Sequence, residues 1–176
     1  YKELSTLEVS AANPLRFLIL TACRTSEVLQ ATWDEVDLKN KRWVIPAERM
    51  KSGIEHRVPL SKEAVKLLKS IPEHNQYIFP GVTTNKPLYG MAMLLLMRNK
   101  GFRRDGPHPA YVPHGFRSSF RDWCEEQSSA PHGVIERSLA HTIPNATERA
   151  YNRSDLFEKR RLLMESWATY LNANLK

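Results

Sequence analysis

The sequence predicts an α+β fold that is mostly helical and contains one small three-stranded antiparallel sheet. Three short stretches rich in β-branched and aromatic residues, at 36–38, 43–45 and 56–58, are separated by polar turns and predict the strands. On both sides of this region, apolar residues recur at the three- and four-residue spacing of helices. The chain shows no internal repeat and no low-complexity tract, which excludes a solenoid.

Caps and apolar spacing predict where the helices lie. Asn13 and Pro14 predict a helix start, and the apolar residues 15–22 predict a helix that is buried on most of its surface. Ser61 predicts the start of a further helix with one apolar face. The other helices are expected over residues 26–31, 61–70, 91–100, 116–127, 134–140 and 155–171.

The last of these helices carries an apolar stripe at near-helical spacing. Two interpretations remain open for the stripe: it packs on its own domain, or it docks on a neighbouring protomer. The residues of the stripe are Leu156, Leu163, Met164, Trp167 and Leu171.

Composition limits the class of protein. With 176 residues, 41% of them hydrophobic, the chain fits one domain with a real core. Its apolar runs are too short to span a bilayer and no signal segment opens it, so we expect a soluble intracellular protein. Cys23 and Cys124 lie about a hundred residues apart and predict two buried, reduced thiols.

The net charge of +7 favours a polyanionic partner. An anionic membrane surface is the alternative, but the sequence has no strongly basic amphipathic helix with bulky aromatic residues on one face. Nucleic acid is therefore the favoured partner.

The tetrapeptide 114–117, His-Gly-Phe-Arg, opens a predicted helix and suggests a phosphate site. His114 and Arg117 are three residues apart, so they project from the same side of the helix near its N-terminus. The free N–H groups and the dipole there favour an anion. In the alternative interpretation, Arg117 pairs with a carboxylate and His114 only caps the helix.

Two further cations stand in unusual places. Arg24 follows a buried helix, and Glu27 is three residues further on, where it can hold the guanidinium; a purely structural ion pair is the alternative. Lys51 lies at the tip of a predicted β-hairpin, from which a long side chain can reach a neighbouring groove. Most lysines in such positions only increase solubility.

His141 ends a predicted helix, and Tyr151 follows ten residues later between Arg149 and Arg153. The flanking arginines favour a phosphate near the tyrosine. In the alternative interpretation, Tyr151 is a half-buried packing residue, as most tyrosines are.

Together, and in this order, these residues resemble the active-site pattern of the tyrosine recombinases. The surroundings are similar as well: Arg-x-x-Glu after a buried helix, Leu-Ala-His, and Ala-Tyr-Asn-Arg. The resemblance covers residues 6–171 and is strongest to integrases of prophages and genomic islands. The matching catalytic positions are Arg24, Lys51, His114, Arg117, His141 and Tyr151, with Glu27 in support.

The chain departs from the family pattern at two positions. Many members have glycine where this chain has Ala22 and Ala140. Because alanine is also small, we expect altered packing and unchanged chemistry.

The resemblance implies a tyrosine-recombinase catalytic fold and a metal-free, cofactor-free strand transfer on DNA. Arg24 and Arg117 would hold the non-bridging phosphate oxygens, and His141 would add a hydrogen bond. Tyr151 would attack the phosphorus and form a 3′-phosphotyrosyl intermediate.

The remaining two positions would move protons. The resemblance implies that His114 assists the tyrosine, as a base or an orienting partner, and that Lys51 protonates the departing 5′-oxygen. The function implied is therefore that of a site-specific DNA recombinase.

Other functions use related residues. A type IB topoisomerase has a similar active-site set, and a basic DNA-binding module with a vestigial site is a second alternative. A metal-dependent nuclease would need converging carboxylates. Asp34, Glu35 and Asp37 are the nearest candidates, but they alternate around a predicted strand and converge poorly.

The resemblance also implies partners and context. Residues 1–176 would form a single catalytic domain, the C-terminal part of a longer integrase, without the N-terminal DNA-clamping domain. The partners would be double-stranded DNA at attachment sites, other copies in a tetramer on DNA, and accessory DNA-bending or directionality proteins. The expected location is the bacterial cytoplasm, at the nucleoid.

Overall fold

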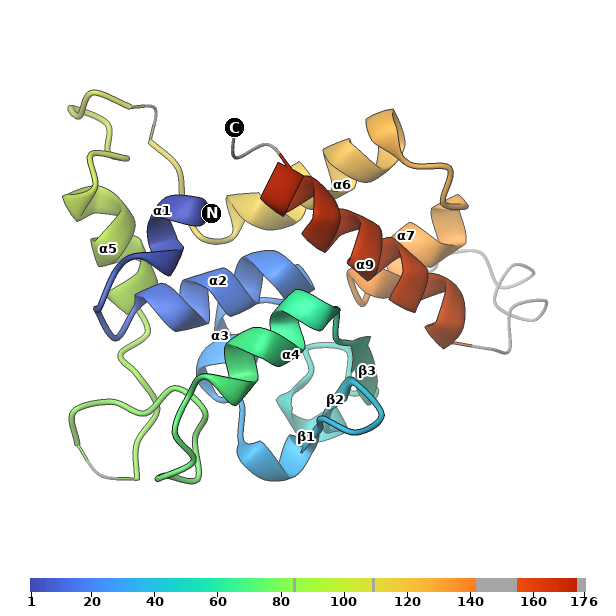
Figure 1. Ribbon diagram of the computed structural model, residues 1–176, viewed down its shortest axis with the longest axis horizontal. Coiled ribbons are helices and arrows are strands. Elements are labelled where there is room, and N and C mark those ends of the chain that lie inside the picture. Colours follow the sequence, from blue (N-terminus) through green and yellow to red (C-terminus); the bar gives the residue numbers. More distant parts are fainter. Residues whose placement is uncertain (84, 109, 142–154, 174–176) are drawn as a thin grey trace.

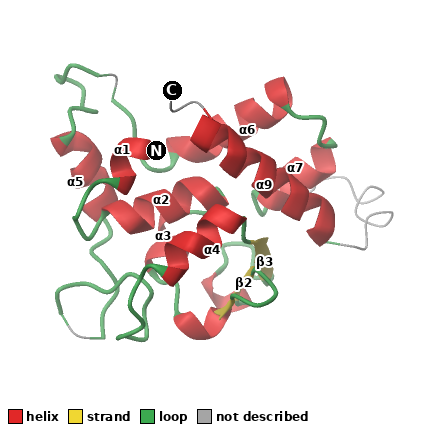
Figure 2. Ribbon diagram, viewed as in Figure 1, coloured by secondary structure: helices red, strands yellow, loops and turns green. Residues whose placement is uncertain are grey.

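The computed structural model describes residues 1–83, 85–108, 110–141 and 155–173, and helices make up most of their regular structure (Figures 1 and 2). The α-helices are α1 (Lys2–Ser5), α2 (Ala12–Thr21), α3 (Thr25–Leu29), α4 (Lys62–Lys69), α5 (Ala92–Asn99), α6 (Gly115–Gln127), α7 (His132–Ser138) and α9 (Phe157–Ala173). The strands are β1 (Val36–Asp37), β2 (Arg42–Ile45) and β3 (His56–Pro59), and the 3-10 helices are η1 (Trp33–Glu35) and η2 (Ala47–Arg49). The α+β fold class predicted from the sequence is confirmed.

The sheet is antiparallel in the order β1-β2-β3, as predicted. In its register Trp43 lies opposite Val58, and Ile45 lies opposite His56. All four side chains are buried, so one face of β2 and β3 packs on the core. The alternation of buried and half-buried residues along β2 is the pattern of a strand with one buried face.

The connection from β2 to β3 contains a 3-10 helix, η2, that the sequence did not predict. Pro46 ends β2 because it has no N–H to donate to the sheet, and η2 follows directly. Arg49 of η2 pairs with Glu35 of η1, which also accepts a hydrogen bond of 2.9 Å from Trp43 Nε1. Glu35 thus stabilises the fold, and it lies in a 3-10 helix directly before β1.

Helix α2 lies at the centre of the molecule, with helices on several sides (Figure 1). Phe17, Leu18 and Leu20 are almost fully buried, as expected of a helix that is apolar all round. The helix begins at Ala12, earlier than the cap predicted at Asn13. Pro14 is tolerated because it falls in the first turn, where its missing N–H would have had no partner.

Helix α9 packs its apolar stripe on the domain's own core. Leu163, Met164 and Trp167 are buried, and Trp167 Nε1 donates a hydrogen bond of 2.7 Å to the carbonyl oxygen of Ile19 in α2. Trp167 also stacks with Tyr170. The interpretation that these side chains dock on a neighbouring protomer is therefore wrong, because they already form part of the core.

Two further observations concern the sequence predictions. Cys23 and Cys124 are buried and free, as predicted. No helix in the described part of the chain is both long and apolar enough to cross a membrane.

His56, the first residue of β3, is a buried titratable group beside several arginines. Burial, followed by the charges of Arg160, Arg117 and Arg24, lowers the pKa of His56 to about 3. The imidazole is therefore neutral in the folded protein at physiological pH. Because an unfolded histidine titrates near pH ~6.5, the unfolded state binds more protons below that pH.

We predict that His56→Gln makes the protein less sensitive to acid. In the wild type, His56 should remove about 1.4 kcal/mol of stability for each pH unit between about 6.5 and 3. Urea unfolding at about pH 7 and about pH 5 should then show a loss up to ~2 kcal/mol larger in the wild type than in His56→Gln. The control His74→Gln, at an exposed position, should behave as the wild type. Equal acid losses in His56→Gln and the wild type would contradict this assignment.

Candidate active site

Arg117 of α6 is the centre of the candidate site. Its side chain is buried, with 5% of the residue exposed. One terminal nitrogen donates to the carbonyl oxygen of Ala22 and the other to that of Leu139, the latter at 2.6 Å. Both acceptors are neutral, and no carboxylate of the described residues pairs with these nitrogens. Within that part of the chain, Arg117 is held by carbonyl groups and not, as in the alternative interpretation, by an acid.

The two carbonyl groups come from the ends of two different helices. Ala22 ends α2 in the left-handed conformation with φ 51°, and Ala140 follows α7 with φ 50°. After α7, the N–H of His141 donates to Glu136 O and that of Ala140 to Arg137 O, which is a Schellman motif. These left-handed turns are what direct the carbonyl groups of Ala22 and Leu139 toward Arg117.

The glycine found at these two positions in many family members therefore has a backbone reason. A Cβ in the left-handed conformation costs about 1–2 kcal/mol, a cost that glycine does not have. The expectation of altered packing at Ala22 and Ala140 stays a prediction; the structure adds that the backbone conformation at both positions favours glycine.

His141 lies beside Arg117 and is held by an acid. Its Nε2 is 3.3 Å from Arg117 Nη2, and its Nδ1 is 2.8 Å from Glu136 Oε2. A guanidinium only donates hydrogen bonds, and a carboxylate only accepts them. Both contacts are hydrogen bonds only if the proton sits on Nδ1 and the lone pair on Nε2.

Arg24 and Glu27 form the predicted pair at the start of α3. Arg24 Nη1 lies 2.7 Å from Glu27 Oε1, and the backbone N–H of Arg24 donates to Glu27 Oε2 at 2.7 Å. Glu27 is buried, whereas a quarter of the Arg24 side chain is exposed. Burial and the nearby charge of Arg24 lower the pKa of Arg117, so the two guanidinium groups share one region.

The other predicted residues are less closely connected. His114 is exposed at the N-cap of α6, one turn before Arg117, and makes no side-chain capping bond, so the capping interpretation is wrong. Lys51 is exposed in the turn after η2, and no hydrogen bond or ion pair connects it to Arg117 within the described ranges. Tyr151 lies outside the described residues.

The sequence analysis missed two residues near this cluster. Glu136 holds His141, and the only signal in the sequence was an acid five residues before a helix-ending histidine. Arg160 of α9 is 2% exposed and donates to the carbonyl oxygens of Asp155 and Arg57, which joins α9 to β3. Its signal was an arginine within an apolar stripe.

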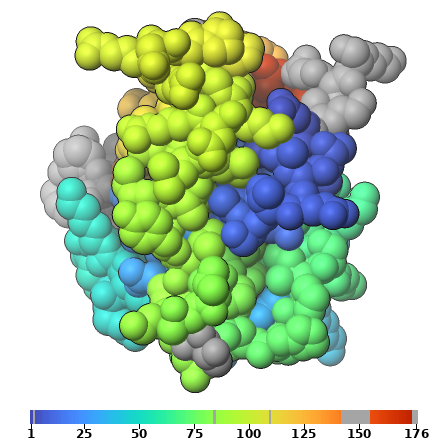
Figure 3. Space-filling model, turned by 90° about the vertical axis from the view of Figure 1, so that its left-hand side faces the viewer, coloured from blue at the N-terminus to red at the C-terminus, as the bar shows by residue number. Residues whose placement is uncertain are grey.

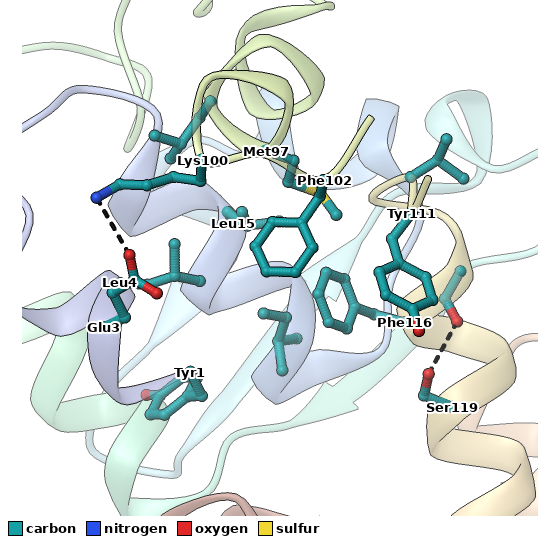
Figure 4. A pocket seen from close by; sticks show the side chains of 14 residues that line it. Tyr1, Glu3, Leu4, Leu15, Met97, Lys100, Phe102, Tyr111, Phe116 and Ser119 are labelled. Atoms are coloured by element: carbon teal, nitrogen blue, oxygen red, sulfur yellow. Dashed lines mark hydrogen bonds and ion pairs between the residues drawn. The ribbon is translucent and has the colours of Figure 1, made fainter. Parts of the chain in front are cut away.

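A separate hollow of about 460 Å³ lies between α1, α2, α5 and α6 (Figure 4). Leu15, Phe102 and Phe116 line it, and an ion pair of 3.1 Å between Lys100 and Glu3 lies at its edge. The N-terminal segment and α5 lie side by side on this face of the molecule (Figure 3). The apolar lining does not suit a phosphate group, so the cation cluster around Arg117 remains the candidate active site.

The fold is that of solved integrase structures. The integrase from mycobacterium phage Brujita superposes with a TM-score of 0.70 at 16% identity, over 93% of this chain and 54% of that one. A lambda integrase tetramer bound to a Holliday junction superposes with a TM-score of 0.56 at 18% identity, over 81% of this chain and 43% of that one. The architecture is thus the tyrosine-recombinase catalytic fold.

Sequence comparison gives the family. The profile of the phage integrase family matches residues 1–157, and the chain belongs to this family. Prophage integrase IntA of Escherichia coli K12 is 36% identical over 174 residues, which are 96% of this chain and 41% of that protein. The chain thus spans about two fifths of the length of this curated relative.

We predict that Ala22→Gly and Ala140→Gly each stabilise the protein. Relief of the left-handed strain, about 1–2 kcal/mol, exceeds the extra entropy of glycine in the unfolded chain, about 0.4–1 kcal/mol, so each variant should gain up to ~1 kcal/mol in urea unfolding. The control Ala168→Gly, within α9, should instead lose about 1 kcal/mol. A loss of stability at Ala22 or Ala140 as large as at Ala168 would contradict the backbone explanation.

Proposed function

We propose that residues 1–176 form the catalytic domain of a site-specific DNA recombinase that cleaves and rejoins strands through a 3′-phosphotyrosyl intermediate at Tyr151. The observation that carries the proposal is the buried Arg117 guanidinium, held by two neutral carbonyl oxygens beside Arg24 and His141. Its charge is fixed in position, and no acid in the described ranges lies on those nitrogens. We propose that the anion bound at this site is a DNA phosphodiester.

In the proposed reaction Arg24 and Arg117 hold the non-bridging oxygens of the scissile phosphate. Negative charge grows on these oxygens as the nucleophile attacks, and guanidinium groups that are already in place stabilise it without reorganising. Loss of one such donor typically slows a reaction by about 10²–10³-fold. Glu27 supports Arg24 by fixing one of its terminal nitrogens.

In the proposed reaction the bonds formed and broken balance, and the steps use only protein groups and DNA. The phenolic oxygen of Tyr151 bonds to phosphorus as its proton passes toward His114, which lies at the positive end of α6. The bond from phosphorus to the 5′-oxygen breaks, and Lys51 supplies the proton that this oxygen needs. Attack by a 5′-hydroxyl from another strand reverses the steps and rejoins the DNA.

The proposed partners follow from charge and from the relatives. The net charge of +7 suits double-stranded DNA at attachment sites. Since lambda integrase is described as a tetramer on a Holliday junction, we extend tetramer assembly on DNA to this chain. We also propose accessory DNA-bending or directionality proteins as partners. The proposed place of action is the nucleoid in the bacterial cytoplasm, because a relative is a prophage integrase of Escherichia coli.

The relatives favour recombination over the two alternatives from the sequence. They carry the name integrase, which supports neither a type IB topoisomerase nor a vestigial DNA-binding module. A topoisomerase would relax supercoiled DNA without a partner site, and a vestigial module would form no covalent adduct.

We predict that Tyr151→Phe abolishes the covalent adduct on a nicked suicide substrate and leaves DNA binding intact. Phenylalanine keeps the ring but lacks the oxygen that bonds to phosphorus. Denaturing gels measure the adduct, and a gel-shift assay measures binding. The control Tyr111→Phe, at an exposed position, should form the adduct normally. An adduct with Tyr151→Phe would overturn the assignment.

We predict that Lys51→Ala is slow on ordinary DNA and is largely rescued when the bridging 5′-oxygen is replaced by sulfur. A thiolate leaves without a proton, so a general acid is no longer needed. Single-turnover cleavage rates on the two substrates provide the measurement, with Lys39→Ala in the turn between β1 and β2 as the control. Equal impairment of Lys51→Ala on both substrates would mean that Lys51 only binds DNA.

A further inference from the structure

Glu136 of α7 is a partly buried acid at the candidate site that the proposed reaction does not use. Its side chain is 14% exposed, and its Oε2 receives the hydrogen bond from His141 Nδ1 at 2.8 Å. Its Oε1 lies 3.5 Å from Arg121 Nε of α6 and 3.9 Å from His132 Nε2. The carboxylate therefore stands between two helices, with one oxygen directed to His141.

The position of Glu136 relative to His141 is set by the backbone. The Schellman motif after α7 makes the N–H of His141 donate to the carbonyl oxygen of Glu136, at 3.0 Å. Two hydrogen bonds, one of the backbone and one of the side chains, thus join the same two residues. Such a double connection leaves the imidazole little freedom to turn away from Arg117.

We propose that Glu136 is the positioning residue that fixes the tautomer of His141 and stabilises its protonated form when phosphate binds. This inference rests on the proposed recombinase function. In the tautomer that the two contacts require, His141 Nδ1 carries the proton and Nε2 accepts from Arg117 Nη2. A phosphate oxygen that takes the Nη2 donor leaves the Nε2 lone pair facing an anion, which is repulsive.

Protonation of Nε2 removes that repulsion. A proton on Nε2 lets His141 donate a hydrogen bond to the phosphate oxygen. The Nδ1 proton stays with Glu136, whose negative charge stabilises the imidazolium. Arg121 and His132 also face the Glu136 carboxylate, at its other oxygen. The acceptor for His141 Nδ1 is Glu136 itself. Carboxylate partners of histidine act in this way at other reaction centres.

The first test is spectroscopic and independent of activity. ¹⁵N-histidine spectra recorded above about pH 8, where an ordinary imidazole is neutral, should show His141 of the DNA-free wild type as the Nδ1–H tautomer. Glu136→Gln should retain this tautomer, because the amide oxygen still accepts from Nδ1. Glu136→Ala should lose it. An Nε2–H tautomer in the wild type would overturn the proposal.

The second test separates the charge from the hydrogen bond. On the suicide substrate Glu136→Gln should cleave about 10–100-fold more slowly than the wild type, since it keeps the tautomer but lacks the charge that stabilises the imidazolium. Glu125→Gln is the matched control, because Glu125 pairs with Arg121 at 3.1 Å from the exposed side and should cleave at the wild-type rate. DNA binding should change little in either variant.

The two proposals fail in different ways. If the wild type cleaves and Glu136→Gln cleaves equally fast, the role of Glu136 is overturned and the recombinase stands. If the wild type forms no adduct with DNA, the proposed function fails, and with it the catalytic role that we give to Glu136. The tautomer spectra would then still decide whether Glu136 orients His141.

Discussion

The burial of the Arg117 guanidinium is the constraint on which the rest of the site depends. A buried cation is costly unless strong hydrogen bonds satisfy it, and here they come from the carbonyl groups of Ala22 and Leu139. These carbonyl groups are available because α2 and α7 both end in left-handed turns. The ends of two helices and the first turn of a third must therefore meet at one point. Arg24 and His141, each two residues beyond one of the acceptors, are brought to the site as a consequence.

Around Arg117 the fold gathers positive charge and keeps negative charge at the edges. Arg24 and Arg160 lie in the same region, and His56 stays neutral because burial and these cations lower its pKa. Glu27 and Glu136 pair with Arg24 and His141 and leave Arg117 to carbonyl oxygens. The cations repel one another in the protein without DNA, so an anion placed among them relieves part of that repulsion. Under the proposed function, the stability of the fold and the binding of phosphate would thus be opposed at the same atoms.

Periodicity and turn chemistry allowed the sheet and the main helices to be predicted, whereas the site residues were proposed from a resemblance to a family. The sequence could not show which helix ends are left-handed, because alanine at Ala22 and Ala140 hides a conformation that glycine would have signalled. The sequence also did not show η2 in the connection that carries Lys51, since η2 contacts Glu35 through Arg49 and these two residues are distant in sequence. Glu136 escaped notice for the same reason. Its hydrogen bond with His141 requires the chain reversal after α7, and no residue spacing in the sequence predicts that reversal.

The left-handed alanines link stability to chemistry at this site. If helices α2 and α7 ended in ordinary right-handed turns, the carbonyl groups that hold Arg117 would point elsewhere, and a buried guanidinium would lose both acceptors. The hydrogen bonds of Arg117 therefore stabilise a backbone conformation that alanine alone disfavours. In return, that conformation fixes the guanidinium beside His141 in the ligand-free protein. A site whose donors are already in place needs little reorganisation as charge develops, which is the condition under which such donors are most effective.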